Sequence, residues 1–152
     1  MDPYRIVLAD DHTLVREGVR KILEGRGDLQ VVGEAGDGVE LLFLLNQLKP
    51  DMVILDISMP NFRGIEAARQ IKMNYPGIKI LILTMHSSRE YLYESISAGA
   101  DGYLLKEDPE SELFSAIDRV REGKGFVSSI LMRELGENKA FMEKIFKFIL
   151  DK

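Results

Sequence analysis

The chain has 152 residues, of which 45% are hydrophobic, 25 are acidic and 20 are basic, and its net charge is −5. This length suits one domain with a substantial core, and the acidic balance argues against a general nucleic-acid binder, so we expect no direct DNA contact. The chain contains no cysteine, which excludes disulfides and thiolate metal sites.

Apolar runs alternate with amphipathic stretches along the chain. The runs lie near residues 5–9, 29–35, 51–55, 78–83 and 102–105. Four of them are almost continuously apolar, as expected for strands that are covered by helices on both faces. The run at 29–35 also contains Gln30 and Glu34, and this pattern predicts a strand at the edge of the sheet.

The stretches between these runs have helical spacing and recognisable ends. Asp37 opens the second helix and is followed three residues later by Glu40, which is a capping-box variant. The third helix is expected to run from about 64 to 75, where a Pro-Gly pair stops it. Ser87 opens the fourth helix. Asp108 is the expected N-cap of the fifth helix, with Pro109 at the first helical position.

Strict alternation of strand and helix with short connections implies right-handed crossovers and a parallel sheet. The sequence therefore predicts an α/β fold, a flavodoxin-like, doubly wound sheet of five parallel strands in the order 2-1-3-4-5. This domain occupies residues 1–123. Residues 124–152 form a C-terminal helical extension, whose last helix carries Phe141, Ile145, Phe148 and Ile149 at helical spacing.

Three aspartates and two further polar residues stand where the apolar runs end. Asp10 and Asp11 follow the first run, Asp56 follows the third, and Thr84 and Lys106 end the last two. Because the carboxyl ends of parallel strands meet at one edge of a sheet, these side chains should gather there. Two carboxylates about 4 Å apart repel by roughly 1 kcal/mol in water and about 4 kcal/mol at an effective dielectric of 20. A hard cation such as Mg²⁺ would offset that repulsion.

This group of residues suits phosphoryl transfer. Asp56 can act as a nucleophile toward phosphorus and become an acyl phosphate. A metal held through Asp10 or Asp11, the ammonium of Lys106 and the hydroxyl of Thr84 would each neutralise or bind one oxygen of the transferring group. Other chemistries fit less well. The acidic residues after the first run would repel a flavin phosphate, a Walker loop is absent, and the second aspartate of strand-1 aspartate phosphatases is missing.

At these positions the sequence resembles a receiver domain of a two-component response regulator. The resemblance covers about residues 4–122 and is carried by residues 7–12, 56–60 and 99–106, which read VLADDH, DISMP and GADGYLLK. It is closest to the branch of the nitrate-response and nitrogen-fixation regulators. The resemblance implies that Asp56 is the phosphoacceptor and that Mg²⁺ is bound by Asp10, Asp11, Asp56 and the backbone carbonyl of Ser58.

The resemblance also implies a switch and its partners. Thr84 and Tyr103 would be the switch pair, in which the hydroxyl moves to the phosphoryl group and the aromatic ring follows it. The donor would be a histidine kinase or a phosphotransfer protein, and a homodimer on phosphorylation is a further expectation. Relatives carry a DNA-binding helix-turn-helix domain, for which the stretch after Gly123 is too short. We favour a naturally short chain over a piece of a longer protein.

Several alternatives stay open at this point. The chain could be a constitutive interaction module that is not controlled by phosphorylation, or, less favoured, a phosphatase that acts on external substrates. In the main interpretation it catalyses only its own phosphorylation and dephosphorylation. His12 and His86 are expected to be solvated loop residues rather than metal ligands, although His86 could influence hydrolysis of the acyl phosphate. The last helix could pack on its own chain, on a second copy or on a partner.

We expect no contact with a membrane. The longest uncharged apolar runs have roughly six residues, far below the roughly 20 that cross a bilayer. The start of the chain lacks a signal-peptide pattern, because a strand-like run follows at once. Together with the absence of cysteine, this predicts a cytoplasmic protein.

Overall fold

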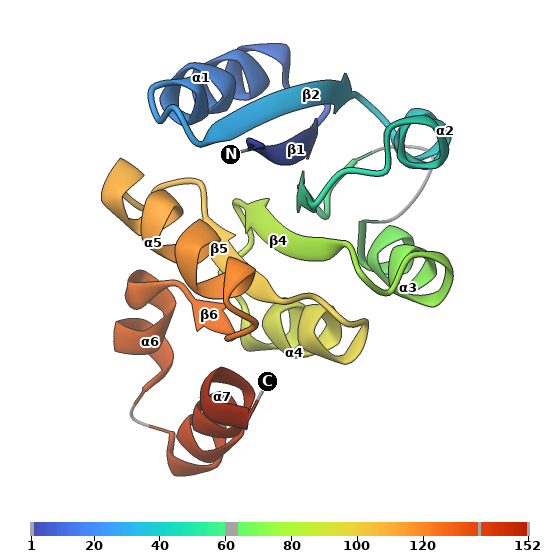
Figure 1. The fold of residues 1–152 in the computed structure, drawn as a ribbon. Coiled ribbons are helices and arrows are strands. Elements are labelled where there is room, and N and C mark those ends of the chain that lie inside the picture. Colours follow the sequence, from blue (N-terminus) through green and yellow to red (C-terminus); the bar gives the residue numbers. More distant parts are fainter. Residues whose placement is uncertain (1, 60–63, 137, 152) are drawn as a thin grey trace.

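The computed structural model describes residues 2–59, 64–136 and 138–151. Its strands and helices alternate along the chain (Figure 1). In chain order the elements are β1 (Tyr4–Ala9), α1 (Thr13–Glu24), β2 (Leu29–Ala35), α2 (Gly38–Leu48), β3 (Met52–Leu55), α3 (Gly64–Asn74), β4 (Lys79–Thr84), α4 (Arg89–Ser97), β5 (Gly102–Leu105), α5 (Glu110–Arg121), β6 (Phe126–Val127), α6 (Ser129–Leu135) and α7 (Lys139–Asp151).

The described residues form one sheet of six parallel strands in the order β2-β1-β3-β4-β5-β6. The predicted α/β fold and the order of its first five strands are confirmed, and β2 lies at the edge as expected. The prediction of five strands was wrong, because β6 adds to β5 through the pairs Gly102↔Phe126 and Tyr103↔Val127. Two residues are too few to show a strand pattern in the sequence.

Helices cover both faces of this sheet, with α1 and α5 on one side and α2, α3 and α4 on the other (Figure 1). Alternate residues of each strand face opposite layers. In β1, Ile6 and Leu8 pack with α1 and α5, whereas Val7 and Ala9 pack with the helices of the other face. Burial on both faces explains why the strands are continuously apolar.

Of the three predicted N-caps, one was confirmed and two were wrong. In α2 the Asp37 carboxylate accepts from the Glu40 amide, and Glu40 Oε1 accepts from the amide of Gly36, both at 2.8 Å. The N-cap of α4 is Ser88 rather than Ser87. The N-cap of α5 is Pro109 rather than Asp108, because the Asp108 carboxylate turns back to accept from the amide of Leu105.

The C-terminal extension contains α6, which the sequence analysis did not identify, as well as the expected last helix α7. Phe141 and Ile145 of α7 are fully buried in the core cluster on the α2–α4 face. The Phe141 ring lies 5.9 Å from the ring of Tyr93 in α4, and Lys144 Nζ lies 4.9 Å from that same Tyr93 ring. Of the three packing alternatives for this helix, the structure shows packing on its own chain.

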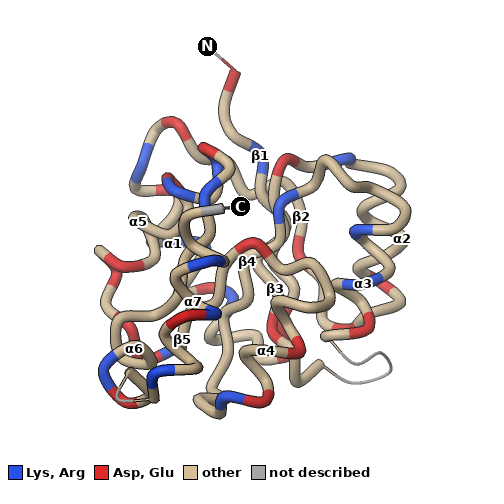
Figure 2. Tube along the Cα trace, turned by 90° about the horizontal axis from the view of Figure 1, so that it is seen from below, with Lys and Arg blue, Asp and Glu red and all other residues tan. Residues whose placement is uncertain are grey.

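Charged residues of both signs are interspersed along the trace (Figure 2). This distribution agrees with the mildly negative net charge of −5. None of the helices in the described ranges is long and apolar enough to cross a bilayer.

Candidate functional site

Backbone hydrogen bonds continue past the last residues of the strands and align the acidic positions. The amide of Asp56 donates to the carbonyl of Ala9 at 2.8 Å, and the amide of Asp10 donates to the carbonyl of Ala35 at 3.0 Å. Asp10 and Asp56 therefore follow the neighbouring strands β1 and β3 at the same edge. Only 7% of Asp10 and 2% of Asp56 are exposed to solvent, so both residues are buried.

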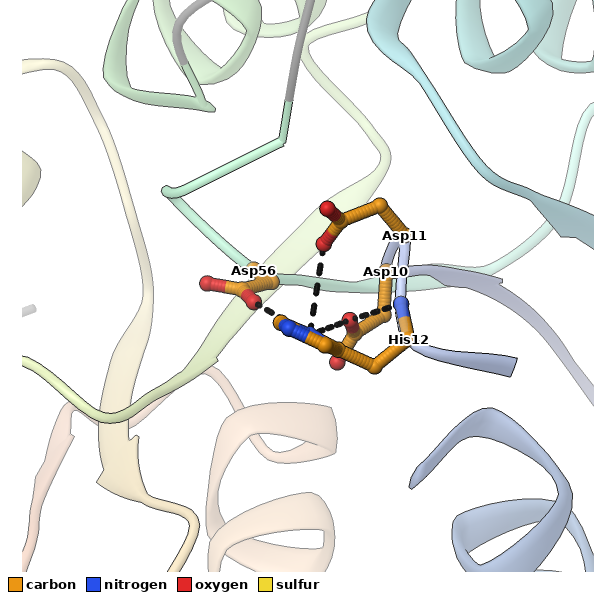
Figure 3. A group of neighbouring side chains, drawn as sticks. All are labelled: Asp10, Asp11, His12 and Asp56. Carbon is orange, nitrogen blue, oxygen red and sulfur yellow. Dashed lines mark hydrogen bonds and ion pairs between the residues drawn. The ribbon is translucent and has the colours of Figure 1, made fainter. Parts of the chain in front are cut away.

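Four neighbouring side chains form a compact acidic cluster at this edge (Figure 3). Asp10, Asp11, His12 and Asp56 each offer one ligand atom, and these atoms all lie within 4.8 Å of one another. The Asp56 carboxylate is thus brought to the Asp10–Asp11 pair, from which it is far apart in the sequence, as the strand ends predicted. The cluster opens to solvent through Asp11 and His12, which are exposed.

His12 lies at the mouth of the acidic cluster. Its Nδ1 lies 2.9 Å from Asp10 Oδ1, 3.3 Å from Asp11 Oδ1 and 4.0 Å from Asp56 Oδ2. The side chain is 57% exposed, as expected for a loop histidine, although its ring also contacts the carboxylates of the cluster. The backbone amide of His12 also donates to Asp10 Oδ1 at 2.8 Å, which is a local side-chain to backbone turn of the kind that aspartate favours.

Lys106 joins the acidic cluster from the end of β5. Its Nζ lies 2.7 Å from Asp10 Oδ2 and 2.8 Å from Asp56 Oδ2, and its backbone amide donates to the carbonyl of Thr84. Burial alone would lower the pKa of this ammonium, but its hydrogen bonds to the two carboxylates outweigh burial and the pKa is raised. The side chain therefore carries its positive charge throughout the neutral pH range.

Asp56 is held by one donor at each carboxylate oxygen. Oδ2 accepts from Lys106, and Oδ1 accepts from the amide of Ser58 at 3.0 Å. The hydroxyl of Ser58 is in turn 2.8 Å from Nε2 of His86, which lies after β4. That link was not predicted, because two residues separated by 27 others in the sequence carry no local signal of contact. The role of the Ser58 carbonyl as a metal ligand remains a prediction.

Thr84 and Tyr103 meet at the backbone of His86. The amide of His86 donates to Thr84 Oγ1 at 3.3 Å, and the hydroxyl of Tyr103 donates to the His86 carbonyl at 2.7 Å. Both Thr84 and Tyr103 are fully buried, and burial, followed by the charges of Tyr91 and Asp56, raises the pKa of the Tyr103 phenol. The His86 ring stacks on Tyr91 of α4, with 4.3 Å between ring centroids.

The donor set fits a hard divalent cation. Three carboxylates face one ammonium, so negative charge remains in excess before any ion binds. Carboxylate oxygens are the ligands that Mg²⁺ prefers, and this ion usually uses only one or two of them together with waters and phosphate oxygens. Asp10, Asp11 and Asp56 could hold such an ion, whereas the part of the chain that the structure describes shows no comparable cluster elsewhere.

Comparisons with known proteins agree with this geometry. The family described as the response regulator receiver domain matches residues 6–118. The uncharacterised transcriptional regulatory protein YxjL of Bacillus subtilis (strain 168) is 44% identical over 129 residues, which cover 85% of this chain and 59% of that protein. Oxygen regulatory protein NreC of Staphylococcus epidermidis is 42% identical over 132 residues, covering 86% of this chain and 61% of that protein. The chain thus spans about three-fifths of the length of these relatives.

Solved structures give the same result. A LuxR-family two-component response regulator from Aurantimonas sp. SI85-9A1 has a TM-score of 0.85 and 36% identity, over 95% of this chain and 99% of that chain. The isolated REC domain of RcsB from Salmonella enterica serovar Typhimurium, in the presence of phosphomimetic BeF3⁻, has a TM-score of 0.81 and 31% identity, over 87% and 98%. The chain therefore belongs to the response regulator receiver family, in the branch of the nitrate-response and LuxR-family regulators.

Proposed function

We propose that the chain is a signalling switch in which Asp56 accepts a phosphoryl group. The observation that carries this proposal is the convergence of Lys106 and the Asp10–Asp11 pair on the buried Asp56 carboxylate. One carboxylate oxygen of Asp56 forms a bond to phosphorus. The bond between phosphorus and the donor breaks with its electron pair, which stays on the donor's nitrogen or oxygen. The product is an acyl phosphate, and a proton goes to the departing group.

The surrounding residues supply charge and position for this step. The Lys106 ammonium, already 2.8 Å from Asp56 Oδ2, pairs with one oxygen of the transferring group. The Ser58 amide, which donates to Oδ1, fixes the orientation of the carboxylate. Asp10, Asp11, Asp56 and the Ser58 carbonyl would hold Mg²⁺. When bound, this ion neutralises charge on the transferring phosphoryl oxygens.

The donor is a histidine kinase or a phosphotransfer protein, and the chain catalyses only its own phosphorylation and dephosphorylation. Family membership supports this donor class. We place the protein in the cytoplasm, since a chain without cysteine suits a reducing compartment. Dimers of the related regulator RcsB bind DNA, so a homodimer formed on phosphorylation, and control of transcription through a further domain, are parts of the same proposal.

Incubation of the full chain with acetyl phosphate and Mg²⁺ tests the proposal. Intact-mass spectrometry should show the gain of one phosphoryl group, and the gain should disappear with EDTA and in Asp56→Asn, whose amide is a poor nucleophile. Glu122→Gln, which also loses a carboxylate but is 63% exposed and lies outside the acidic cluster, should still gain the group. A wild-type chain that gains no mass, or an Asp56→Asn chain that gains as much, would refute phosphoacceptance at this residue.

Thr84 and Tyr103 would convert this modification into a change of shape. The Thr84 hydroxyl now accepts from the His86 amide. To donate its own proton to a phosphoryl oxygen on Asp56, Oγ1 would move toward that residue and away from the His86 amide. The β4–α4 segment would then lose one of its two bonds to the switch pair, while Tyr103 retains the other. The phosphoryl group shifts the population only as far as it favours one of these two arrangements.

Tyr103→Phe should uncouple the phosphorylation of Asp56 from the change in the β4–α4 segment. The change removes the hydroxyl that binds the His86 carbonyl, and an unpaired buried acceptor costs about 1–3 kcal/mol. We expect the mass gain to persist, while the change in amide hydrogen exchange of residues 85–97 on adding BeF3⁻ and Mg²⁺ becomes smaller than in the wild type. Tyr75→Phe, which loses a hydroxyl bonded to Asn46 instead, is the control. An unaltered exchange response in Tyr103→Phe would rule out this role.

A further inference from the structure

Arg16 of α1 contacts the backbone of the acidic cluster at Asp10. Its Nη1 donates to the backbone carbonyl of Asp10 at 2.5 Å. The pairing of β1 with β2 ends at Ala9↔Ala35, so the Asp10 carbonyl lies one residue past the last pair of that ladder. A carbonyl in this position needs a donor from elsewhere, and the guanidinium of Arg16 provides it.

The guanidinium of Arg16 is itself anchored to the edge strand. Its Nε donates to Glu34 Oε1 of β2 at 3.1 Å, and Arg20, one turn further along α1, donates to the other oxygen of the same carboxylate. The Arg16 and Glu34 side chains are only 19% and 23% exposed. An arginine whose planar group is fixed from two sides directs its remaining donor with little freedom.

This contact fixes the peptide that joins the first two aspartates. The Asp10 amide is bound by the Ala35 carbonyl and the Asp10 carboxylate by Lys106, while the Asp10 carbonyl is bound by Arg16. Because a peptide unit is planar, the direction of that carbonyl sets where the backbone of Asp11 begins. The Asp11 carboxylate is 34% exposed, and its contact within the cluster is His12 Nδ1 at 3.3 Å. Its placement therefore depends mainly on the backbone.

We infer that Arg16 is a positioning residue for the Mg²⁺ site, acting through the Asp10–Asp11 peptide. The inference rests on the proposed function and deepens it by naming a group outside the acidic cluster that sets the affinity for the ion. Residues that orient metal ligands commonly change metal affinity by about 10- to 100-fold when they are removed. Loss of the Arg16 side chain should thus weaken the binding of Mg²⁺. It should have a smaller effect on the rate of phosphoryl transfer that is measured at saturating Mg²⁺.

The two arginines that share Glu34 provide a matched test. Arg16→Met keeps an apolar stem and removes the donors, and isothermal titration with Mg²⁺ should show a Kd about ten-fold or more weaker than that of the wild type. Arg20→Met removes the same charge from the same helix and the same Glu34 partner, yet makes no contact with Asp10, so its Kd should stay within about two-fold of the wild type. Arg16→Lys keeps one charged donor and should recover part of the loss. At saturating Mg²⁺ the phosphorylation rate of Arg16→Met should lie near that of the wild type.

The outcomes distinguish a failure of the positioning role of Arg16 from a failure of the proposed function. Equal Kd values for Arg16→Met and Arg20→Met would overturn the positioning role while leaving phosphoacceptance intact. A wild-type chain that binds no Mg²⁺ would instead overturn the proposed function itself. If circular dichroism shows that Arg16→Met does not fold, Glu34→Gln takes its place. That change loosens the anchor of the guanidinium, and an unchanged Kd for Glu34→Gln would count against the inference.

Discussion

Lys106→Met will slow phosphorylation of Asp56 without weakening the binding of Mg²⁺. The Lys106 ammonium contacts both Asp10 and Asp56, at 2.7 and 2.8 Å. Removing one preorganised group that stabilises charge in a transition state typically costs about 10²–10³-fold in rate. Methionine has similar length and no charge, so the carboxylates lose their fixed counter-charge. They should then bind a divalent cation at least as tightly as before.

A purely structural role of Lys106 would lower the phosphorylation rate and the Mg²⁺ affinity together, whereas a catalytic role lowers only the rate. Phosphorylation rates with acetyl phosphate at saturating Mg²⁺, and Mg²⁺ titrations of the unphosphorylated chain, measure the two quantities. Lys124→Met is the matched control, because Lys124 is 54% exposed and pairs only loosely with Glu122 at 3.6 Å. A rate equal to that of the wild type, or an affinity for Mg²⁺ that falls together with the rate, would contradict the assignment.

Gly64→Ala will destabilise the fold and disturb the segment that follows Asp56. A Cβ at Gly64, the first residue of α3, would lie 2.2 Å from the Cα of Ile57 and 2.8 Å from the carbonyl oxygen of Asp56. These are backbone atoms that cannot rotate away, so either α3 or the segment that follows Asp56 must move. Overpacking of this kind costs about 1–3 kcal/mol or more, which exceeds the roughly 1 kcal/mol that alanine gains over glycine in a helix.

Urea unfolding and phosphorylation by acetyl phosphate measure the two consequences of Gly64→Ala. Gly18→Ala in α1 is the control, because a Cβ at Gly18 meets nothing within 4 Å. That substitution should stabilise the protein by about 0.5–1 kcal/mol. We expect Gly64→Ala to lower both the free energy of unfolding and the rate of phosphorylation. A Gly64→Ala protein that is as stable and as readily phosphorylated as the wild type would show that this close approach does not position Asp56.

The sequence predicts the sheet and the acidic residues well, because both depend on strands with a strong local signal. Runs such as Met52–Leu55 are wholly apolar and wholly buried. The residue that follows each run must then lie at the carboxyl edge. Asp56 and Lys106 meet there although 50 positions separate them, since the order of the strands brings their ends together. The chemistry of the pocket follows from topology and residue type alone.

Other parts of the site depend on contacts that no local pattern encodes. β6 has two residues, too few for alternation to be seen. Asp108 bonds back to the amide of Leu105, and this competing interaction defeats its expected role as the cap of α5. The place of His12 is set by a turn at Asp10. Arg16 carries the spacing of an ordinary helix-surface residue, and its contact with the Asp10 carbonyl appears only when β1, β2 and α1 are packed together.

The position of the phosphoryl group is the most direct test of the whole account. The chain is phosphorylated with acetyl phosphate and Mg²⁺ and then treated with borohydride, which reduces an aspartyl phosphate to homoserine and so marks the modified residue. Peptide mass spectrometry should find homoserine at position 56 and aspartate at positions 10 and 11. Homoserine at either of those two positions, or unmodified aspartate at all three in a chain that has gained the phosphoryl mass, would contradict it.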